Sequence, residues 1–259
     1  MIELDEITQV LKRMGTDGAV LTDHHVAHVV ANGLDLLSQR EIPGVAITSE
    51  RKGDGLSTQI TVERDARIES PVHLCIGVLH ATDRQHIQIQ VRLEQDSAAK
   101  IVAHCFFPRA QKVEHIMDAA IEIESGAELR YAEGHYHGPF GGVIVLPRAQ
   151  VRIRPHGRYS SDFSLTSGRV GKLRIDYSVN LEAHAVAELT ARVFGRAEDD
   201  IGIREAAVLS GENARSLIKT RIALQGHARA EITGVTEGNA KGARGHSRQS
   251  KDQTCRRGS

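Results

Sequence analysis

The feature that most constrains this chain is an alternation of apolar and polar residues that persists from Val45 almost to the end. In residues 86–94 every second side chain is aliphatic, and the side chains between them are polar. Because successive side chains of a strand point to opposite faces, this pattern predicts strands with one buried face. After Pro43 no segment sustains a helical stripe over three turns. About 200 residues of short strands therefore predict a mainly β fold.

A short unit recurs within this β region. In residues 209–246 an apolar strand is followed by a turn of Gly and polar residues, a small residue and another strand. A small residue at a corner lets neighbouring stretches of backbone pass closely. The unit predicts a solenoid of stacked coils, with an ordinary β-sandwich as the alternative. Further copies lie, at uneven intervals, at residues 93–101, 123–129, 146–151 and 181–189.

The two ends of the chain have a different character. Residues 3–14 carry an amphipathic helical stripe that Gly15 ends, and a second helix is predicted to start at His24. The end of the chain is polar, which predicts disorder. We expect an N-terminal helical cap over residues 1–44, a β-helix core over residues 45–246 and a disordered tail over residues 247–259.

Composition excludes several classes of function. The chain has 33 Lys plus Arg and 33 Asp plus Glu, so no positive surface for nucleic acid is indicated. Aromatic residues make up 3% with no Trp, which argues against stacking platforms for bases. The acidic N-terminus is unlike a signal peptide and no apolar run reaches membrane-spanning length. We expect a cytoplasmic protein with no nucleic-acid or membrane partner.

Histidine is the conspicuous functional residue type, with 14 copies. His135 and His137 form an HxH pair, and on a strand both imidazoles would lie on one face, where they can bind a metal. Cupins use such a pair with a Glu about four residues later, but Gly141 stands there. A cupin-like metal enzyme is therefore an alternative that lacks its third ligand, and packing or surface roles for both histidines remain open.

The three cysteines, Cys75, Cys105 and Cys255, have no CxxC spacing, so neither a disulfide framework nor a zinc knuckle is indicated. A solenoid could stack His104, Cys105 and His115 near the HxH pair. Adjacent residues on a strand face opposite sides, so His104 and Cys105 should not reach one metal together. Cys105 and Cys255 are candidate thiols, with a buried apolar role as the alternative for Cys105.

No nucleotide-binding motif is present in the sequence. Residues 168–172 look like part of a phosphate loop, but Thr166 replaces the leading glycine and Leu173 replaces the required Ser or Thr. We interpret the segment as a hairpin turn. If ATP is used, another chain must supply the ATPase.

Three blocks of the chain resemble the SufB/SufD family, the scaffold proteins of the SUF system for iron–sulfur cluster assembly. The likeness extends over about residues 45–246. The blocks are MDAAIEIESGAELRYAEGHYHGP at residues 117–139, GRVGKLRIDYSVNLEAHAVAELTARVFG at residues 168–195 and TEGNAKGARGH at residues 236–246.

The resemblance implies a right-handed parallel β-helix flanked by helices, acting as a scaffold and not as an enzyme by itself. It implies a dimer with a SufB/SufD-type paralogue or with a second copy, formed through the ends of the β-helix. It also implies an ABC-type ATPase partner similar to SufC and, indirectly, a cysteine desulfurase system. No intrinsic cofactor is implied, only an iron–sulfur cluster held transiently in a complex.

The end of the chain departs from the family pattern. The resemblance places a cysteine three residues after His246, and Gln249 stands there. Cys255 lies six residues further on in a polar context. His246 is then the matched residue that could ligate iron, and the chain is expected to be a C-terminally incomplete member. A degenerate interaction module without chemistry is a third alternative.

Overall fold

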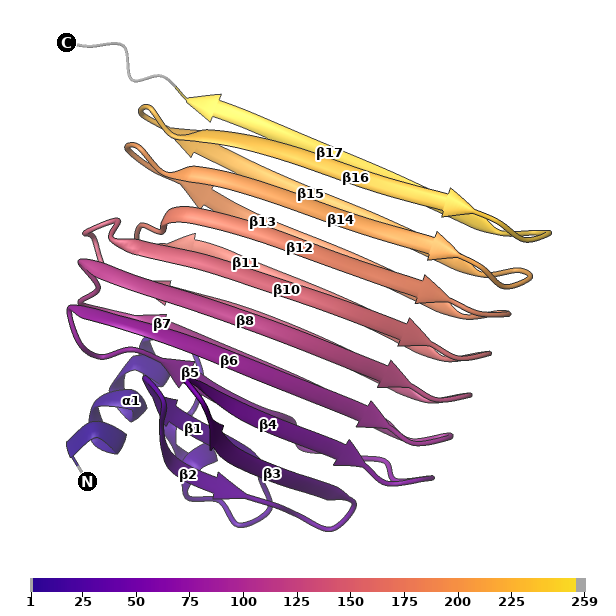
Figure 1. Ribbon diagram of the computed structural model, residues 1–259, viewed down its shortest axis with the longest axis horizontal. Coiled ribbons are helices and arrows are strands. Elements are labelled where there is room, and N and C mark those ends of the chain that lie inside the picture. Colours follow the sequence, from indigo (N-terminus) through magenta and orange to yellow (C-terminus); the bar gives the residue numbers. More distant parts are fainter. Residues whose placement is uncertain (1, 255–259) are drawn as a thin grey trace.

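The computed structural model describes residues 2–254, which form one α-helix, one 3₁₀ helix and 17 strands (Figure 1). The helices are α1 (Ile2–Arg13) and η1 (Gly18–Leu21). The strands are β1 (His28–Asn32), β2 (Asp35–Arg40), β3 (Val45–Lys52), β4 (Gly55–Val62), β5 (Val72–Gly77), β6 (Thr82–Leu93), β7 (Ala98–Phe107), β8 (Lys112–Ile123), β9 (Glu128–His137), β10 (Val143–Ile153), β11 (Arg158–Ser167), β12 (Gly171–Leu181), β13 (Val186–Gly195), β14 (Asp200–Leu209), β15 (Arg215–Gln225), β16 (Arg229–Gly238) and β17 (Arg244–Thr254).

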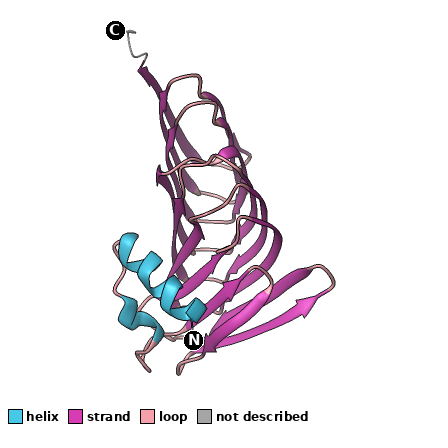
Figure 2. Cartoon of the chain, turned by 90° about the vertical axis from the view of Figure 1, so that its left-hand side faces the viewer, coloured by secondary structure: helices cyan, strands magenta, loops and turns pink. Residues whose placement is uncertain are grey.

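The strands form two facing sheets that make a solenoid of about seven turns (Figures 1 and 2). From β4 onward each coil contributes one strand to each sheet, so strands that neighbour one another in a sheet are two apart in the chain. We call them sheet A, ordered β17-β15-β13-β11-β9-β7-β5-β1-β2, and sheet B, ordered β16-β14-β12-β10-β8-β6-β4-β3. From β4 onward neighbouring strands are parallel. The predicted β-solenoid is confirmed, and the β-sandwich alternative is wrong.

Each coil turns at one end through the same tight corner. A residue with positive φ lies at this corner in seven successive coils, and a small residue follows it. Ala127, which follows Gly126, is fully buried, as the repeating unit predicts. A larger side chain here would hold adjacent coils apart. The positive-φ corner residues are Asp65, Asp96, Gly126, His156, His184, Asn213 and Gly242.

The space between the sheets is filled in two different ways. Near the tight corners the inward side chains are almost all aliphatic, and they form one continuous core from β1 to β15. Nearer the opposite end of the middle coils the interior also contains aromatic and polar side chains, including Phe107 and Cys105. This second region contains the candidate site.

Outside the solenoid, charged side chains pair between neighbouring coils. Asp118 of β8 accepts from Arg148 of β10 and lies 2.8 Å from the His86 ring of β6. Because parallel coils lie in register, residues one coil apart are direct neighbours, and opposite charges there stabilise the stack modestly.

The N-terminal region is helical only at its start. Helix α1 forms as predicted and packs Ile7, Val10 and Leu11 against the outer face of sheet A, where Phe106 is fully buried (Figure 2). Within the described residues no helix is both long and apolar enough to cross a bilayer.

The predicted second helix from His24 is wrong. The segment instead forms the antiparallel strands β1 and β2, joined by a turn at Gly33, whose φ is +61°. β1 also adds in parallel to β5, so its adjacent valines, Val29 and Val30, are buried on opposite faces. Burial on both faces gives an apolar run that can be mistaken for a helical stripe.

The predicted disorder of residues 247–254 is also wrong. Residues up to Thr254 belong to β17, which pairs in parallel with β15. Backbone groups make this ladder, so a polar sequence can extend it once the preceding coil provides the edge. Residues 255–259, including Cys255, lie outside the described residues.

Candidate functional site

Strand β9 directs an unusual row of side chains into the solenoid. Tyr131, Glu133, His135 and His137 alternate with outward residues, and all four are buried. The prediction that both histidines share one face follows from the period of two and is confirmed. The face is the inner one, so the surface alternative for this pair is wrong.

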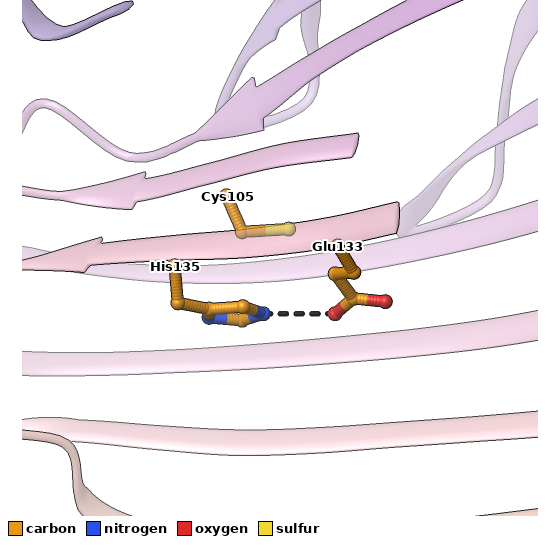
Figure 3. Close-up of side chains that lie close together, drawn as sticks. All are labelled: Cys105, Glu133 and His135. Carbon is orange, nitrogen blue, oxygen red and sulfur yellow. Dashed lines mark hydrogen bonds and ion pairs between the residues drawn. The ribbon is translucent and has the colours of Figure 1, made fainter. Parts of the chain in front are cut away.

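Cys105 of β7 lies next to His135 in the register of sheet A. Its sulfur, a Glu133 oxygen and a His135 nitrogen all lie within 4.8 Å of one another (Figure 3). Figure 3 shows the three side chains gathered from the two neighbouring strands. Thiolate, carboxylate and imidazole are all ligands of zinc and of similar divalent metals.

His104 points the other way, as expected for the residue beside Cys105. Its Nε2 lies 3.0 Å from Nδ1 of His73, and the two rings are stacked on the outer side of sheet A. Cys75 is also on that side, packed in the cluster under α1. The interior therefore contains Cys105 but neither His104 nor Cys75.

A chain of hydrogen bonds links the cluster to the backbone. Glu133 Oε1 lies 2.8 Å from His135 Nε2, and the Tyr177 hydroxyl donates to Glu133 Oε2 at 3.3 Å. On its other side, His135 Nδ1 lies 3.2 Å from His137 Nε2. His137 Nδ1 is 3.3 Å from the carbonyl oxygen of Arg169, in the loop before β12. Each ring is thus held at both nitrogens.

Burial sets the electrostatics of these groups. It lowers the pKa of His135 to about 3 and that of His137 well below its usual value. It raises the pKa of Glu133 to about 7 and that of the Cys105 thiol well above its usual value. The common cause is removal of the charged form from water. The interior therefore disfavours an uncompensated charge on any of them.

His115 approaches the cluster from the opposite sheet. It is fully buried on β8, and its ring centroid lies 6.5 Å from that of His135. Its Nδ1 lies 2.7 Å from Gln85 Oε1, whereas its Nε2 has no hydrogen-bond partner among residues 2–254. Phe107 packs beside both imidazoles. The predicted proximity of His115 and Cys105 to the HxH pair is confirmed.

Comparison with known proteins gives two relatives that cover almost the whole chain. No protein-family model matches the chain. The iron–sulfur cluster assembly SufBD family protein of Methanocaldococcus jannaschii is 29% identical over 244 residues, which cover 94% of this chain and 77% of that protein. The corresponding protein of Pyrococcus horikoshii is 27% identical over 244 residues, 94% of this chain and 74% of that protein. Over 94% of its length, the chain is similar to proteins of the SufBD family. The resemblance inferred from the three sequence blocks is thereby confirmed.

The residues that the SufBD resemblance singled out lie away from the interior cluster. His246 pairs with Leu217 in the register of β15 and β17, and alternation places it on the outer face. Its strand is four steps from β9 in sheet A, about 19 Å along the stack. Gln249 pairs with Thr220, a buried residue, so it continues an inward row. The structure therefore separates His246 from His135 and His137.

Sequence reasoning missed Glu133. The cupin spacing places the third metal ligand, a carboxylate, at the position of Gly141. In this chain the carboxylate near the two histidines is Glu133, two residues before His135. Glu133, His135 and His137 have the same parity on one strand, so the period of two that linked the histidines also selects Glu133. The alternation along this strand therefore predicts that Glu133 shares a face with both histidines, whereas the cupin spacing points to the wrong position.

Proposed function

We propose that this SufBD protein is a scaffold component of iron–sulfur cluster assembly that acts with an ABC-type ATPase similar to SufC. The observation that carries the proposal is the likeness of 94% of the chain to two proteins whose names state iron–sulfur cluster assembly. The β-solenoid supports it, because stacked coils give a rigid framework whose ends are suited to pairing. In this role the chain is cytoplasmic and performs no catalysis alone.

The loop at residues 168–170 supports a separate ATPase subunit. It connects β11 to β12, which belong to different sheets, so it is neither a hairpin turn nor a phosphate loop. A phosphate loop leads into a helix whose N-terminal amides bind the phosphates. Here a strand follows, so ATP hydrolysis in this proposal belongs to the partner.

We place the partner surface at the C-terminal coil. This coil consists of β16 and β17, and it contains His246. A SufB/SufD-type paralogue or a second copy would pair here. His246 would supply one ligand to iron, and the nascent cluster would be a transient substrate shared with the partner. Cysteine desulfurase would deliver the sulfur.

Anaerobic reconstitution tests this proposal. The chain would be co-expressed with the SufC-like ATPase and desulfurase of its own organism, and complex formation and cluster absorption would be measured. We expect a stable complex with the ATPase and a cluster signal that His246→Ala weakens. Gln249→Cys, which adds a thiol to the inward row of β17, should increase the signal. Neither complex nor cluster in the unmodified system would refute the scaffold role.

The structure bears differently on the two alternative functions, a cupin-like enzyme and a degenerate interaction module. The cupin-like enzyme loses its fold analogy, because cupins are antiparallel double sheets and this chain is a parallel solenoid. Glu133 and His135 side chains are also 1% and 0% exposed, which leaves a substrate no approach. A degenerate interaction module would show normal complex formation, without a cluster, in variants that lack His246 and Cys255.

A further inference from the structure

We propose that Cys105, Glu133 and His135 form a buried site for one divalent transition-metal ion of the zinc or iron(II) class. The site rests on the interior geometry of β7 and β9 and does not depend on the scaffold role. Its donors, one sulfur, one carboxylate oxygen and one imidazole nitrogen, lie within 4.8 Å of one another. This donor set suits metals that accept both soft and hard ligands.

The hydrogen-bond chain fixes which nitrogen of each histidine carries the proton. The Arg169 carbonyl oxygen can only accept, so His137 carries its proton on Nδ1 and donates to that oxygen. A neutral His137 then has a lone pair on Nε2. His135 Nδ1 must donate to that lone pair, across 3.2 Å. His135 Nε2 is therefore an unprotonated donor atom that faces the interior cluster.

This lone pair meets a second acceptor. Glu133 Oε1 lies 2.8 Å from His135 Nε2, a distance at which two lone pairs repel unless a proton or a cation lies between them. In the metal-free chain the carboxyl proton of Glu133 occupies that position. In the metal-bound chain a cation takes its place and also displaces the thiol proton of Cys105. Two protons leave as one divalent ion binds.

Charge balance favours a divalent ion in this environment. A thiolate from Cys105 and a carboxylate from Glu133 carry two negative charges, and His135 is neutral. A divalent cation therefore gives a site with no net charge, which a dry interior tolerates far better than an isolated ion. A monovalent cation would leave one negative charge buried without compensation.

The surroundings orient the donors as second-shell groups do in metal sites. His137 holds the His135 ring through Nδ1, and the Tyr177 hydroxyl holds the second oxygen of Glu133. His115 is a further donor nearby. Gln85 donates from Nε2 to two backbone oxygens and thus presents Oε1 to His115 Nδ1. His115 Nε2 is left as a buried lone pair without a partner among the described residues. It is not one of the donors within 4.8 Å of one another, so it would have to move to become a fourth ligand.

His137 lies beside both a surface cavity and the interior cluster. A surface cavity of about 740 Å³ lies between α1 and the loops after β7, β9 and β11, and His137 is one of its lining residues. His135 is in contact with the inner side of His137. His137 therefore belongs both to the wall of this cavity and to the hydrogen-bond chain of the cluster.

Titration with Co²⁺ tests the site without any partner or activity. The double variant Cys75→Ala/Cys255→Ser retains Cys105 as its single cysteine, so any cobalt–thiolate absorption must come from that residue. We expect one Co²⁺ per chain, with a thiolate charge-transfer band and the d–d bands of a four-coordinate ion. In this background, Glu133→Gln and His135→Gln should weaken binding by more than about 100-fold.

Two controls keep the proposal falsifiable. Glu133→Gln retains the shape of the side chain and an oxygen for Tyr177, so its folding can be verified by circular dichroism before titration. Cys105→Ser in the natural background should lose the band while Cys75→Ala retains it. Absence of a one-to-one thiolate band in the double variant, or a band that persists at full affinity in Glu133→Gln and His135→Gln, would overturn the proposal.

His137 acts as a positioning residue in this proposal. His137→Phe should lower Co²⁺ affinity about 10- to 100-fold, with the same band positions, because the ligands are unchanged and only their orientation is lost. Tyr136→Phe is the matched control, because that side chain points outward toward Arg13. Equal effects of the two substitutions would contradict the orienting role of His137.

Discussion

Thr220 of sheet A donates a hydrogen bond to Glu205 of sheet B across the solenoid interior, with 2.5 Å between Oγ1 and Oε2. Glu205 is 2% exposed and Thr220 is fully buried. Burial raises the pKa of the Glu205 carboxyl above its usual value, and the hydrogen bond from Thr220 offsets only part of this effect. The pair ties the two sheets together, and Thr220 lies three strands beyond Glu133 in the register of sheet A.

This pair predicts a pH dependence of stability. Because the folded-state pKa is raised, the native chain binds more protons than the unfolded chain between the unfolded pKa of about 4.3 and the folded value. The contribution of Glu205 to the free energy of unfolding is therefore largest at low pH and is lost as the pH rises through the folded pKa. Glu205→Gln should remove this loss and be more stable than the natural chain at pH 8. Urea unfolding of both proteins across pH 5–8 measures the difference, and parallel curves would contradict it.

The turn after β13 predicts a stabilising substitution. Ala197 has a φ of +52°, and Gly226 has a φ of +73° at the equivalent turn one coil later. A left-handed conformation costs a residue with a Cβ about 1 kcal/mol more than glycine. Ala197→Gly should therefore raise the free energy of unfolding by about 0.5–1 kcal/mol. Gly226→Ala is the reciprocal control and should lower it by a similar amount, as measured by urea denaturation. A decrease in the free energy of unfolding for Ala197→Gly, or an increase for Gly226→Ala, would show that the turn relaxes to another conformation.

The contact between α1 and sheet A predicts a local loss of stability. Leu11 is fully buried against the outer face of the sheet, in the cluster that contains Phe106 and Cys75. Leu11→Ala should lower the free energy of unfolding by about 2–5 kcal/mol. Hydrogen exchange should increase in α1, β1 and β5, while β13 and β15 retain their protection. Uniform loss of protection would mean that the solenoid unfolds as a single unit.

The metal site predicts a thermal shift. A ligand that binds only the folded chain stabilises it by about 2.7 kcal/mol at 100 times its Kd. Zn²⁺ at that concentration should raise the Tm by about 5–10 °C, and a chelator should reverse the effect. Cys105→Ser should show no such shift, whereas Cys75→Ala should respond as the natural chain does. Equal responses of the two cysteine variants would place the ion elsewhere.

Much of this fold was predictable because its signals are local. Alternation within a strand depends on which residues follow one another, and so does the small residue after each corner, such as Ala127. The same alternation predicted that His135 and His137 share a face. The alternation failed to predict β1, because both faces of this strand are buried. Val29 packs in the solenoid core and Val30 packs against α1. It also failed for β17, where the edge of β15 supplies the hydrogen bonds that a polar sequence does not signal.

By itself the sequence determined the period of two, the corners and the face on which each side chain of a strand lies, because these depend on neighbours in the chain. Only the tertiary structure decided that Cys105 lies beside His135, with Glu133 as the third group. The residues from β7 and β9 meet because the coil length sets their parallel register. That register depends on how about 30 residues close one turn, so it follows from packing between coils and not from local pattern.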